Sequence, residues 1–379
     1  MSDPHADPIF LSHCGLSPLY PGSRNVMNEL INVHTRYGDR LFKDHYIQEL
    51  DLSKKLFAQY LHTEPENMAL VRNTTEAMSM IANGYPWESG DEIVLYVHEY
   101  PANYYPWINL IKTRGVQVKV LGNHVVHGGV PSHLPGRWIW EDLESQVSSR
   151  TRMIVMSHVQ FVTGFAADLA RLGQFCQDRD IELVVDGAQS LGALPIDVES
   201  YRISGLSGSG WKWLRGPMGV SPFFTSPAFR EKIALTVVGA ETMVQGTDFL
   251  NHDWDPHRSA RRYEYATTPI YQVAGLNRAV QEIFLVWEAW DLFHHLLHLQ
   301  DHFLHHLHRR EFIPLLWPKE HRSGILSLYH PRAEEVVDYL DKKGIVVSAR
   351  GGFMRVAPHY YNTEAEMEYL AQCLNNFAG

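Results

Sequence analysis

The feature that most constrains the fold is an alternation of short apolar runs with stretches of helical spacing through the first two-thirds of the chain. The runs are rich in β-branched residues, which is typical of parallel strands covered on both faces. We predict strands at Ile93–Val97, Val116–Leu121, Met153–Ser157, Ile181–Asp186 and Gly219–Phe224, and helices at Thr74–Asn83, Asn103–Thr113 and Asp168–Asp178. Repeated strand–helix–strand units predict an α/β domain with a mainly parallel sheet flanked by helices.

The pattern changes near Leu276. Residues 276–310 predict one or two long helices, and a small α+β unit follows them. Its predicted elements are strands at Ile325–Leu328, Ile345–Ser348 and Met354–Val356, and helices at Ala333–Lys343 and Thr363–Phe377. We therefore expect a large domain over residues 1–275, whose first 20 residues border the active site, and a smaller C-terminal α+β domain over residues 276–379.

Charge and composition exclude several classes of protein. The 33 basic and 43 acidic residues give a net charge of −10, which argues against nucleic acid as a partner. We expect no membrane span, because no apolar run reaches the length that one needs. The first ten residues lack the features of a signal peptide, and three scattered cysteines predict no disulfide framework. These features favour a reducing, cytoplasmic location.

The strongest chemical signal is an acid and a lysine in a fixed order. Asp186 lies at the end of a predicted buried strand, where ligands bind in open α/β sheets. A buried carboxylate needs a positive partner, and a protonated pyridine nitrogen would supply one. Lys212 follows small residues that let the backbone approach a phosphate, and Ser209 among them can donate a hydroxyl. The pattern predicts pyridoxal 5'-phosphate (PLP), with Lys212 as its Schiff-base lysine.

Two upstream segments complete this pattern. Thr74 and Thr75 begin a predicted helix, where free N–H groups and hydroxyls make an anion site. Tyr100 follows the strand at Ile93–Val97 and can present an aromatic face to the cofactor ring. Asn103, in the same segment, is a candidate substrate contact.

Together these motifs resemble the class V aminotransferase superfamily of fold-type-I PLP enzymes. The matching segments run from about Leu11 to Asn362 and are most similar to the branch of isopenicillin-N-epimerase-like and cysteine-desulfurase-like enzymes. The resemblance implies that Asp186 pairs with the pyridinium and that Gln189 bonds the phenolic oxygen of the cofactor. It implies that Thr74, Thr75 and Ser209 hold the phosphate, and that Tyr100 stacks on the ring. Thr267 would reach the phosphate of the neighbouring subunit, which implies a homodimer with shared active sites.

The C-terminal motif resembles that of the kynureninases. In the segment Arg355-Val356-Ala357-Pro358, the resemblance assigns Arg355 to the α-carboxylate of an amino-acid substrate. A guanidinium can bind a planar carboxylate through two hydrogen bonds. Arg350 matches the carboxylate arginine of the desulfurases and is the second candidate. We favour Arg355, and a substrate with two carboxylates would use both.

The chain departs from its relatives at two places. Trp211 stands where most relatives have histidine, so one contact with the cofactor is altered. The catalytic cysteine of desulfurases would lie ahead of Arg350, but the stretch Arg332–Ala349 contains none. We therefore do not expect persulfide-forming desulfuration. Cys14 lies in a segment that borders the pocket in relatives, and we interpret it as a small buried residue rather than a pocket thiol.

No metal site is predicted. His294, His298 and His302 recur at a spacing that places them on one helix face, but other histidines surround them without order. We interpret this face as solvated.

The cofactor permits several reactions after the Cα proton is removed. The favoured reading is a C–S lyase that eliminates the β-substituent of a cysteine S-conjugate, or an epimerase. A true aminotransferase is the alternative. A non-catalytic regulator with the same fold is a minor alternative. Such regulators carry a DNA-binding domain, and this chain has neither the length nor the basic charge for one.

Overall fold

A seven-stranded sheet forms the centre of the molecule. The computed structural model describes residues 7–125 and 127–378. The strand order is β2-β8-β7-β6-β5-β3-β4, and the neighbours from β7 to β4 are parallel. The strands span Met68–Val71 (β2), Glu92–Tyr96 (β3), Gln117–Leu121 (β4), Thr151–Ser157 (β5), Glu182–Asp186 (β6), Gly205–Ser207 (β7) and Ser221–Thr225 (β8). The prediction of a mainly parallel α/β sheet is confirmed.

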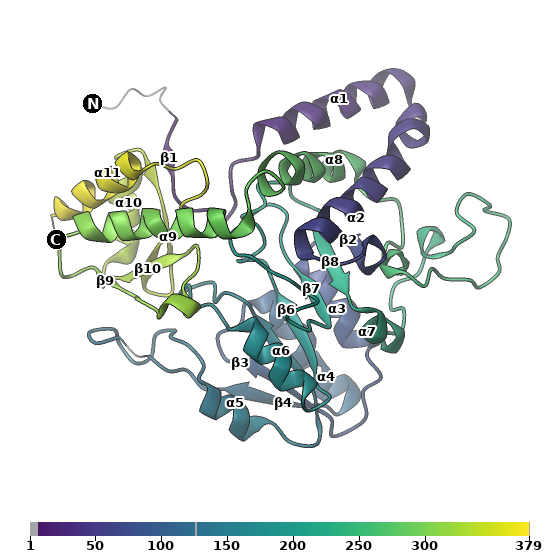
Figure 1. Ribbon diagram of the computed structural model, residues 1–379, viewed down its shortest axis with the longest axis horizontal. Helices are drawn as coiled ribbons and strands as arrows, with labels where there is room; N and C mark the ends of the chain where they lie inside the picture. Colours follow the sequence, from purple (N-terminus) through teal and green to yellow (C-terminus); the bar gives the residue numbers. More distant parts are fainter. Residues whose placement is uncertain (1–6, 126, 379) are drawn as a thin grey trace.

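Helices cover both faces of this sheet (Figure 1). Alternate residues of β3 pack to opposite sides, with Val94 and Tyr96 in one core and Ile93 and Leu95 in the other. The first core includes side chains from α2, α5, α6 and α8, and the second includes side chains from α3, α4 and α7. The helices of the large body span Pro21–Tyr37 (α1), Ile47–Leu61 (α2), Thr74–Gly84 (α3), Tyr105–Arg114 (α4), Trp140–Gln146 (α5), Leu169–Gln177 (α6), Pro227–Lys232 (α7) and Ile270–Ala279 (α8).

The smaller α+β unit has its own sheet and its own core. The sheet order is β12-β13-β10-β9, with strands at Ile313–Pro314 (β9), Leu326–Tyr329 (β10), Ser348–Arg350 (β12) and Phe353–Val356 (β13). The helices are Ala289–His306 (α9), Ala333–Asp341 (α10) and Glu364–Asn375 (α11). In Figure 1 the long helix α9 leads from α8 into this unit.

The N-terminal segment joins the smaller unit rather than the large one. Strand β1 (Ile9–Phe10) pairs in parallel with β11 (Ile345–Val346), and Ser12 forms a further bridge with Ala357. The prediction assigned residues 1–275 to the large domain, whereas residues 9, 10 and 12 pair with residues of the C-terminal unit. This pairing carries the following residues toward the space between the two units.

Three predicted elements differ in detail. The strand predicted at Gly219–Phe224 is β8, which is antiparallel to both of its neighbours. The strand predicted at Ile345–Ser348 is divided into β11 and the start of β12, which belong to different sheets. The helix predicted from Asn103 begins at Tyr105, after a 3-10 turn at Pro101–Asn103.

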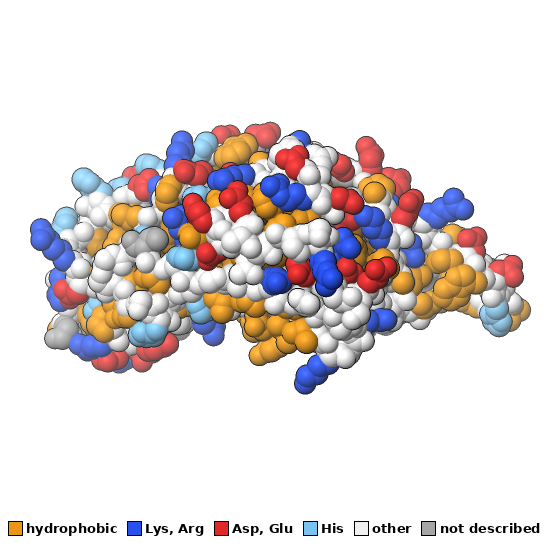
Figure 2. All heavy atoms as spheres, turned by 90° about the horizontal axis from the view of Figure 1, so that it is seen from below, with side chains coloured by type: hydrophobic (Ala, Val, Ile, Leu, Met, Phe, Trp, Pro, Cys, Tyr) orange, Lys and Arg blue, Asp and Glu red, His pale blue; other side chains and the backbone are white. Residues whose placement is uncertain are grey.

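The segment between α7 and α8 projects from the body on the side opposite the smaller unit (Figure 1). Figure 2 shows hydrophobic side chains at this projecting end. Phe249, Leu250 and Trp254 in this segment are 68%, 91% and 69% exposed. Among the described residues, no helix combines the length and the apolar character that crossing a membrane requires.

Candidate active site

Five loops converge at one edge of the large sheet. β2 runs in the same direction as β7, because β8 is antiparallel to both, and β3, β5 and β6 are parallel to β7. The carboxyl ends of these strands therefore meet, as at the ligand-binding edge of other open α/β sheets. At or just beyond these ends lie Thr74, Thr75, Tyr100, Phe161, Asp186, Gln189, Ser209 and Lys212.

Asp186 is the last residue of β6, and its side chain is 3% exposed. One carboxylate oxygen, Oδ1, accepts a hydrogen bond of 2.8 Å from the Ala188 N–H. Burial raises the pKa of Asp186, and the charge of Lys212 partly offsets the rise. A carboxylate held this way can face a cationic group of a ligand such as a protonated pyridine.

The Lys212 amine lies between this acid and an aromatic ring. Its Nζ is 5.3 Å from the ring centroid of Tyr100. Burial lowers the pKa of Lys212, and Asp186 raises it again in part. A lowered pKa increases the fraction of neutral amine, which is the form that attacks a carbonyl carbon.

Tyr100 is 45% exposed, and residues beneath it fix its position. Its ring packs edge-on against Phe161, with centroids 5.3 Å apart. The preceding residue, Glu99, is buried and accepts hydrogen bonds from the Ser157 N–H at 3.0 Å and from Asn103 at 2.9 Å. Burial raises the pKa of Glu99 to about 7. This buried acid ties the Tyr100 loop to the end of β5.

Asn103 does not lie where a substrate contact is expected. Its side chain is fully buried, donates to Glu99 and accepts a 3.3 Å hydrogen bond from the Trp107 indole. Both ends of the amide are therefore bonded inside the protein. The prediction that Asn103 contacts substrate needs correction. The Asn103 side chain instead contacts Glu99 and Trp107, beneath the Tyr100 loop.

The N-terminus of α3 has the donors of an anion site. The Asn73 side chain caps the helix by accepting from the Glu76 N–H at 3.0 Å, whereas the N–H groups of Thr74 and Thr75 have no partner among the described residues. The Thr74 hydroxyl is buried and also lacks a partner there, and Thr75 is exposed. Ser209 lies after β7 at the same sheet edge and is 5% exposed.

Three further predicted residues have different surroundings. The Gln189 amide donates to the Cys14 carbonyl and accepts from the Trp213 indole, both at 2.9 Å, so one of its N–H bonds is left for a ligand. Trp211 is half-buried, and its carbonyl accepts from the Ser17 N–H at 3.1 Å. Thr267 is exposed beside a small cavity of about 120 Å³ that Arg72 and Glu76 also line.

Arg355 is 3% exposed and lies in the central strand β13 of the smaller sheet. Met354 and Val356 on either side pack into the core of that unit, so Arg355 faces the opposite way, as strand alternation predicts. Its guanidinium donates to the Phe161 carbonyl at 2.7 Å and to the Ser348 hydroxyl at 2.9 Å. Its Nε is buried without a partner, and it forms no ion pair within the described ranges.

Arg350 and Cys14 lie near the same group. Both arginines lower the pKa of Lys212, Arg355 more than Arg350, and Arg350 itself is exposed. The Cys14 sulfur is 2% exposed and lies 3.7 Å from the Ser348 hydroxyl oxygen. Cys14 is thus a buried residue at the border of the site. Its thiol also contributes to the electrostatics of Lys212.

These residues fit PLP. The unpartnered Thr74 hydroxyl and the free N–H groups of α3 match a phosphate, and buried Asp186 matches a pyridinium. Lys212 can attach to the aldehyde, and the exposed Tyr100 ring can cover the pyridine face. The anionic, cationic and aromatic partners that such a cofactor needs are all supplied from one sheet edge.

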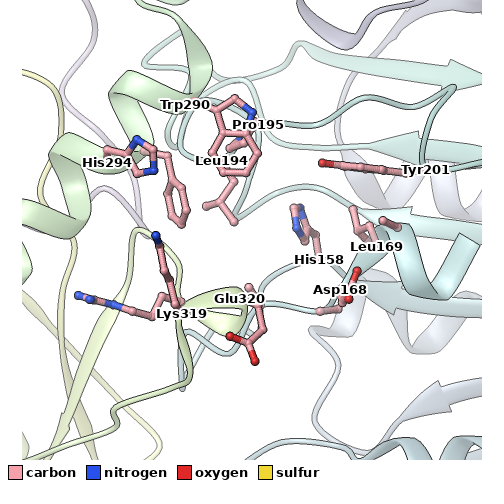
Figure 3. Close-up of a pocket in the computed structure, with 15 residues that line it drawn as sticks. His158, Asp168, Leu169, Leu194, Pro195, Tyr201, Trp290, His294, Lys319 and Glu320 are labelled. Carbon is pink, nitrogen blue, oxygen red and sulfur yellow. The ribbon is translucent and has the colours of Figure 1, made fainter.

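A separate cavity of about 550 Å³ lies between the large sheet and α9 (Figure 3). His158, Leu194, Tyr201, Trp290 and Lys319 are among its lining residues, and Lys212 and Asp186 are not. The His158 ring points into it and is 6% exposed, and burial lowers its pKa to about 3. This cavity is therefore distinct from the site at the sheet edge that contains Lys212 and Asp186.

Sequence reasoning missed three supports of the site. Glu99 lies two residues beyond the predicted strand Ile93–Val97, so its place in the loop after a strand could have marked it. Ser348 and the Phe161 carbonyl bind Arg355 from two distant segments of the chain. No local pattern signals these contacts, since they depend on how the smaller unit packs against the large one.

Comparisons with known proteins agree with this geometry. A probable cysteine desulfurase of Methanothermobacter thermautotrophicus is 23% identical over 360 residues, which cover 88% of this chain and 84% of the relative. An Escherichia coli cysteine desulfurase is 25% identical over 313 residues, covering 79% of this chain and 72% of the relative.

Solved structures show the same fold. The cystine C–S lyase C-DES, in complex with its reaction product cysteine persulfide, superposes with a TM-score of 0.88 at 20% identity, over 99% of both chains. The apo cysteine desulfurase of Thermococcus onnurineus NA1 gives 0.84 at 21% identity, over 97% of this chain and 94% of that one. The family model for class V aminotransferases matches residues 24–370, so the chain belongs to this family of PLP-dependent enzymes.

Proposed function

We propose that the protein is a C–S lyase that cleaves the Cβ–S bond of a cysteine-derived amino acid, such as cystine or a cysteine S-conjugate, by β-elimination. The observation that carries the proposal is Arg355, a buried guanidinium near Lys212 that has no acidic partner among residues 7–125 and 127–378. A buried cation without an anion is costly, and the α-carboxylate of an amino acid would supply one. The substrate of the C-DES enzyme, named as cystine in its structure, has this chemistry.

Arg355, Asp186 and Lys212 have separate roles in the proposed reaction. Arg355 would hold the α-carboxylate and so orient the Cα–H bond, and Asp186 would stabilise the protonated pyridine of the cofactor. Bound PLP supplies an electron sink for the pair left at Cα. The Lys212 Nζ takes the Cα proton, the Cβ–S bond breaks, and the thiolate leaves with its electron pair. The remaining enamine hydrolyses to pyruvate and ammonia.

The cysteines favour elimination over sulfur transfer to the enzyme. Cys14, Cys176 and Cys373 are all buried, and the segment ahead of Arg350 contains no cysteine. Sulfur transfer from cysteine needs an accessible thiol, and it leaves alanine rather than pyruvate. Elimination needs no such thiol. Epimerisation additionally needs a proton donor on the opposite face of Cα, and aminotransfer would leave the cofactor in its amine form.

The reaction products test this proposal. Holoenzyme incubated with cystine should release pyruvate and ammonia in equal amounts and form a persulfide, and Lys212→Ala should abolish all three. Cys14→Ser should retain pyruvate release, because elimination transfers no sulfur to an enzyme thiol. Alanine from cysteine that depends on Cys14 would instead indicate a desulfurase. A D-amino acid would indicate an epimerase, and a keto acid that retains the substrate side chain would indicate an aminotransferase.

A further inference from the structure

A cluster of histidine and glutamate lies between α9 and α11, away from the catalytic residues. His302 and His306 are one turn apart on α9, and Glu368 is on α11. One potential ligand atom from each lies within 4.8 Å of the other two. The sequence alone suggests a solvated face for these histidines, but in the structure His302 is only 22% exposed, because α11 covers it.

The two helices are held together by a common core. Leu299 and Phe303 of α9 are buried in one cluster with Met367 and Leu370 of α11. The Asn375 side chain donates to the His306 carbonyl at 2.8 Å and so ties the ends of the helices together. The spacing between the two histidines and Glu368 is therefore set by packing that does not depend on these three side chains.

The Nδ1 atoms of the two rings face a carbonyl and a carboxylate. His306 Nδ1 donates to the His302 carbonyl at 2.9 Å, and His302 Nδ1 lies 3.9 Å from a carboxylate oxygen of Glu364. His302 Nε2 is buried without a hydrogen-bond partner among the described residues. Histidines that bind metals through Nε2 have this arrangement, with Nδ1 directed to a carbonyl or carboxylate.

We propose that His302, His306 and Glu368 bind a divalent zinc-class cation that links α9 to α11. Two imidazoles and one carboxylate are a ligand set that Zn²⁺ accepts, with water in the fourth position. Ligand atoms about 2.0–2.1 Å from Zn²⁺ lie about 3.3 Å apart in a tetrahedron, so small side-chain rotations would close the site. Glu364, which also accepts from His298 at 2.5 Å, would orient His302 from the outer shell.

Zinc titration of the PLP-loaded protein tests this site. After removal of metal with a chelator, ZnCl₂ is titrated into wild type, His306→Gln, Glu368→Gln and the control His294→Gln, an exposed histidine of the same helix. At a zinc concentration that just saturates the site in wild type, wild type and His294→Gln should bind more zinc per chain than the other two. In His306→Gln and Glu368→Gln, affinity at this site should fall by more than about 10-fold, the lower end of what losing an outer-shell partner costs.

Thermal unfolding gives a second readout. Zinc should raise the unfolding midpoint of wild type and His294→Gln, and it should not do so in His306→Gln or Glu368→Gln, because only a bound ligand shifts the equilibrium. The visible absorbance of the cofactor confirms that each variant is folded. The proposal is wrong if wild type binds no zinc, or if all four proteins bind it with equal stoichiometry and affinity.

Discussion

Burial of charge at single residues sets the chemistry of the site. Asp186 and Lys212 are each shifted toward their neutral form by burial, and each partly restores the charge of the other. Arg355 has no such partner among the described residues, although its side chain is as buried as that of Asp186. Before a substrate binds, hydrogen bonds to the Phe161 carbonyl and the Ser348 hydroxyl partly offset the cost of burying the Arg355 charge. The substrate carboxylate can therefore be bound by a cation that is already in place.

The two arginines of this region should differ when each is replaced. Arg355→Ala should weaken substrate binding by about 2–5 kcal/mol, because it removes one partner of a buried charge pair. Arg350→Ala should do less, since Arg350 is exposed. The change in cofactor absorbance on titration with amino acid measures both affinities, and PLP content should stay the same. Full affinity in Arg355→Ala with a collapse in Arg350→Ala would transfer the role to Arg350.

At the scale of elements, local patterns predicted the strands that present the site. The continuous apolar runs of β3, β5 and β6 are visible in the sequence, and so is the acid that ends β6. The strands β2 and β7, of four and three residues, were not predicted. The pairing of β1 with β11 joins residues about 340 positions apart. No local pattern encodes such a contact, so the sequence did not predict it.

Replacing Thr74 at the N-terminus of α3 should have opposite effects on the stability of the apoprotein and on the affinity for PLP. Thr74→Val keeps the shape of the side chain and removes its buried, unpartnered hydroxyl. The apoprotein should become more stable, by about 1 kcal/mol or more, because an unsatisfied polar group is removed. PLP should bind more weakly, by about 1.5–3 kcal/mol, because a hydrogen bond to a charged group is lost.

Thermal unfolding of the apoprotein and equilibrium dialysis of PLP measure the two effects. Thr113→Val is the matched control, since this exposed hydroxyl on α4 donates to the Asn109 carbonyl of its own helix and should leave PLP affinity unchanged. Unchanged PLP affinity in Thr74→Val would show that this hydroxyl does not hold the phosphate.

At the scale of the molecule, two exposed features are relevant to the expected homodimer. Thr267 is exposed and lines the same small cavity as Arg72, the residue that follows β2. The projecting segment between α7 and α8 exposes Phe249, Leu250 and Trp254 to solvent (Figure 2). Exposed apolar side chains gathered on a projection are typical of a surface that binds another protein. Both features fit a homodimer in which each subunit contributes to the site of the other.

We therefore expect a homodimer that persists on dilution, and PLP should raise its thermal stability by linkage. Leu250→Asp should weaken the dimer, because it introduces a charge into an apolar interface, whereas Val286→Asp, at an equally apolar exposed position outside the projection, should not. Thr267→Val should leave the dimer intact and lower PLP affinity. Analytical ultracentrifugation and PLP titration separate these effects. An active, PLP-loaded monomer would contradict the shared site. A dimer in which Thr267→Val leaves PLP affinity unchanged would show that each site is formed by one chain.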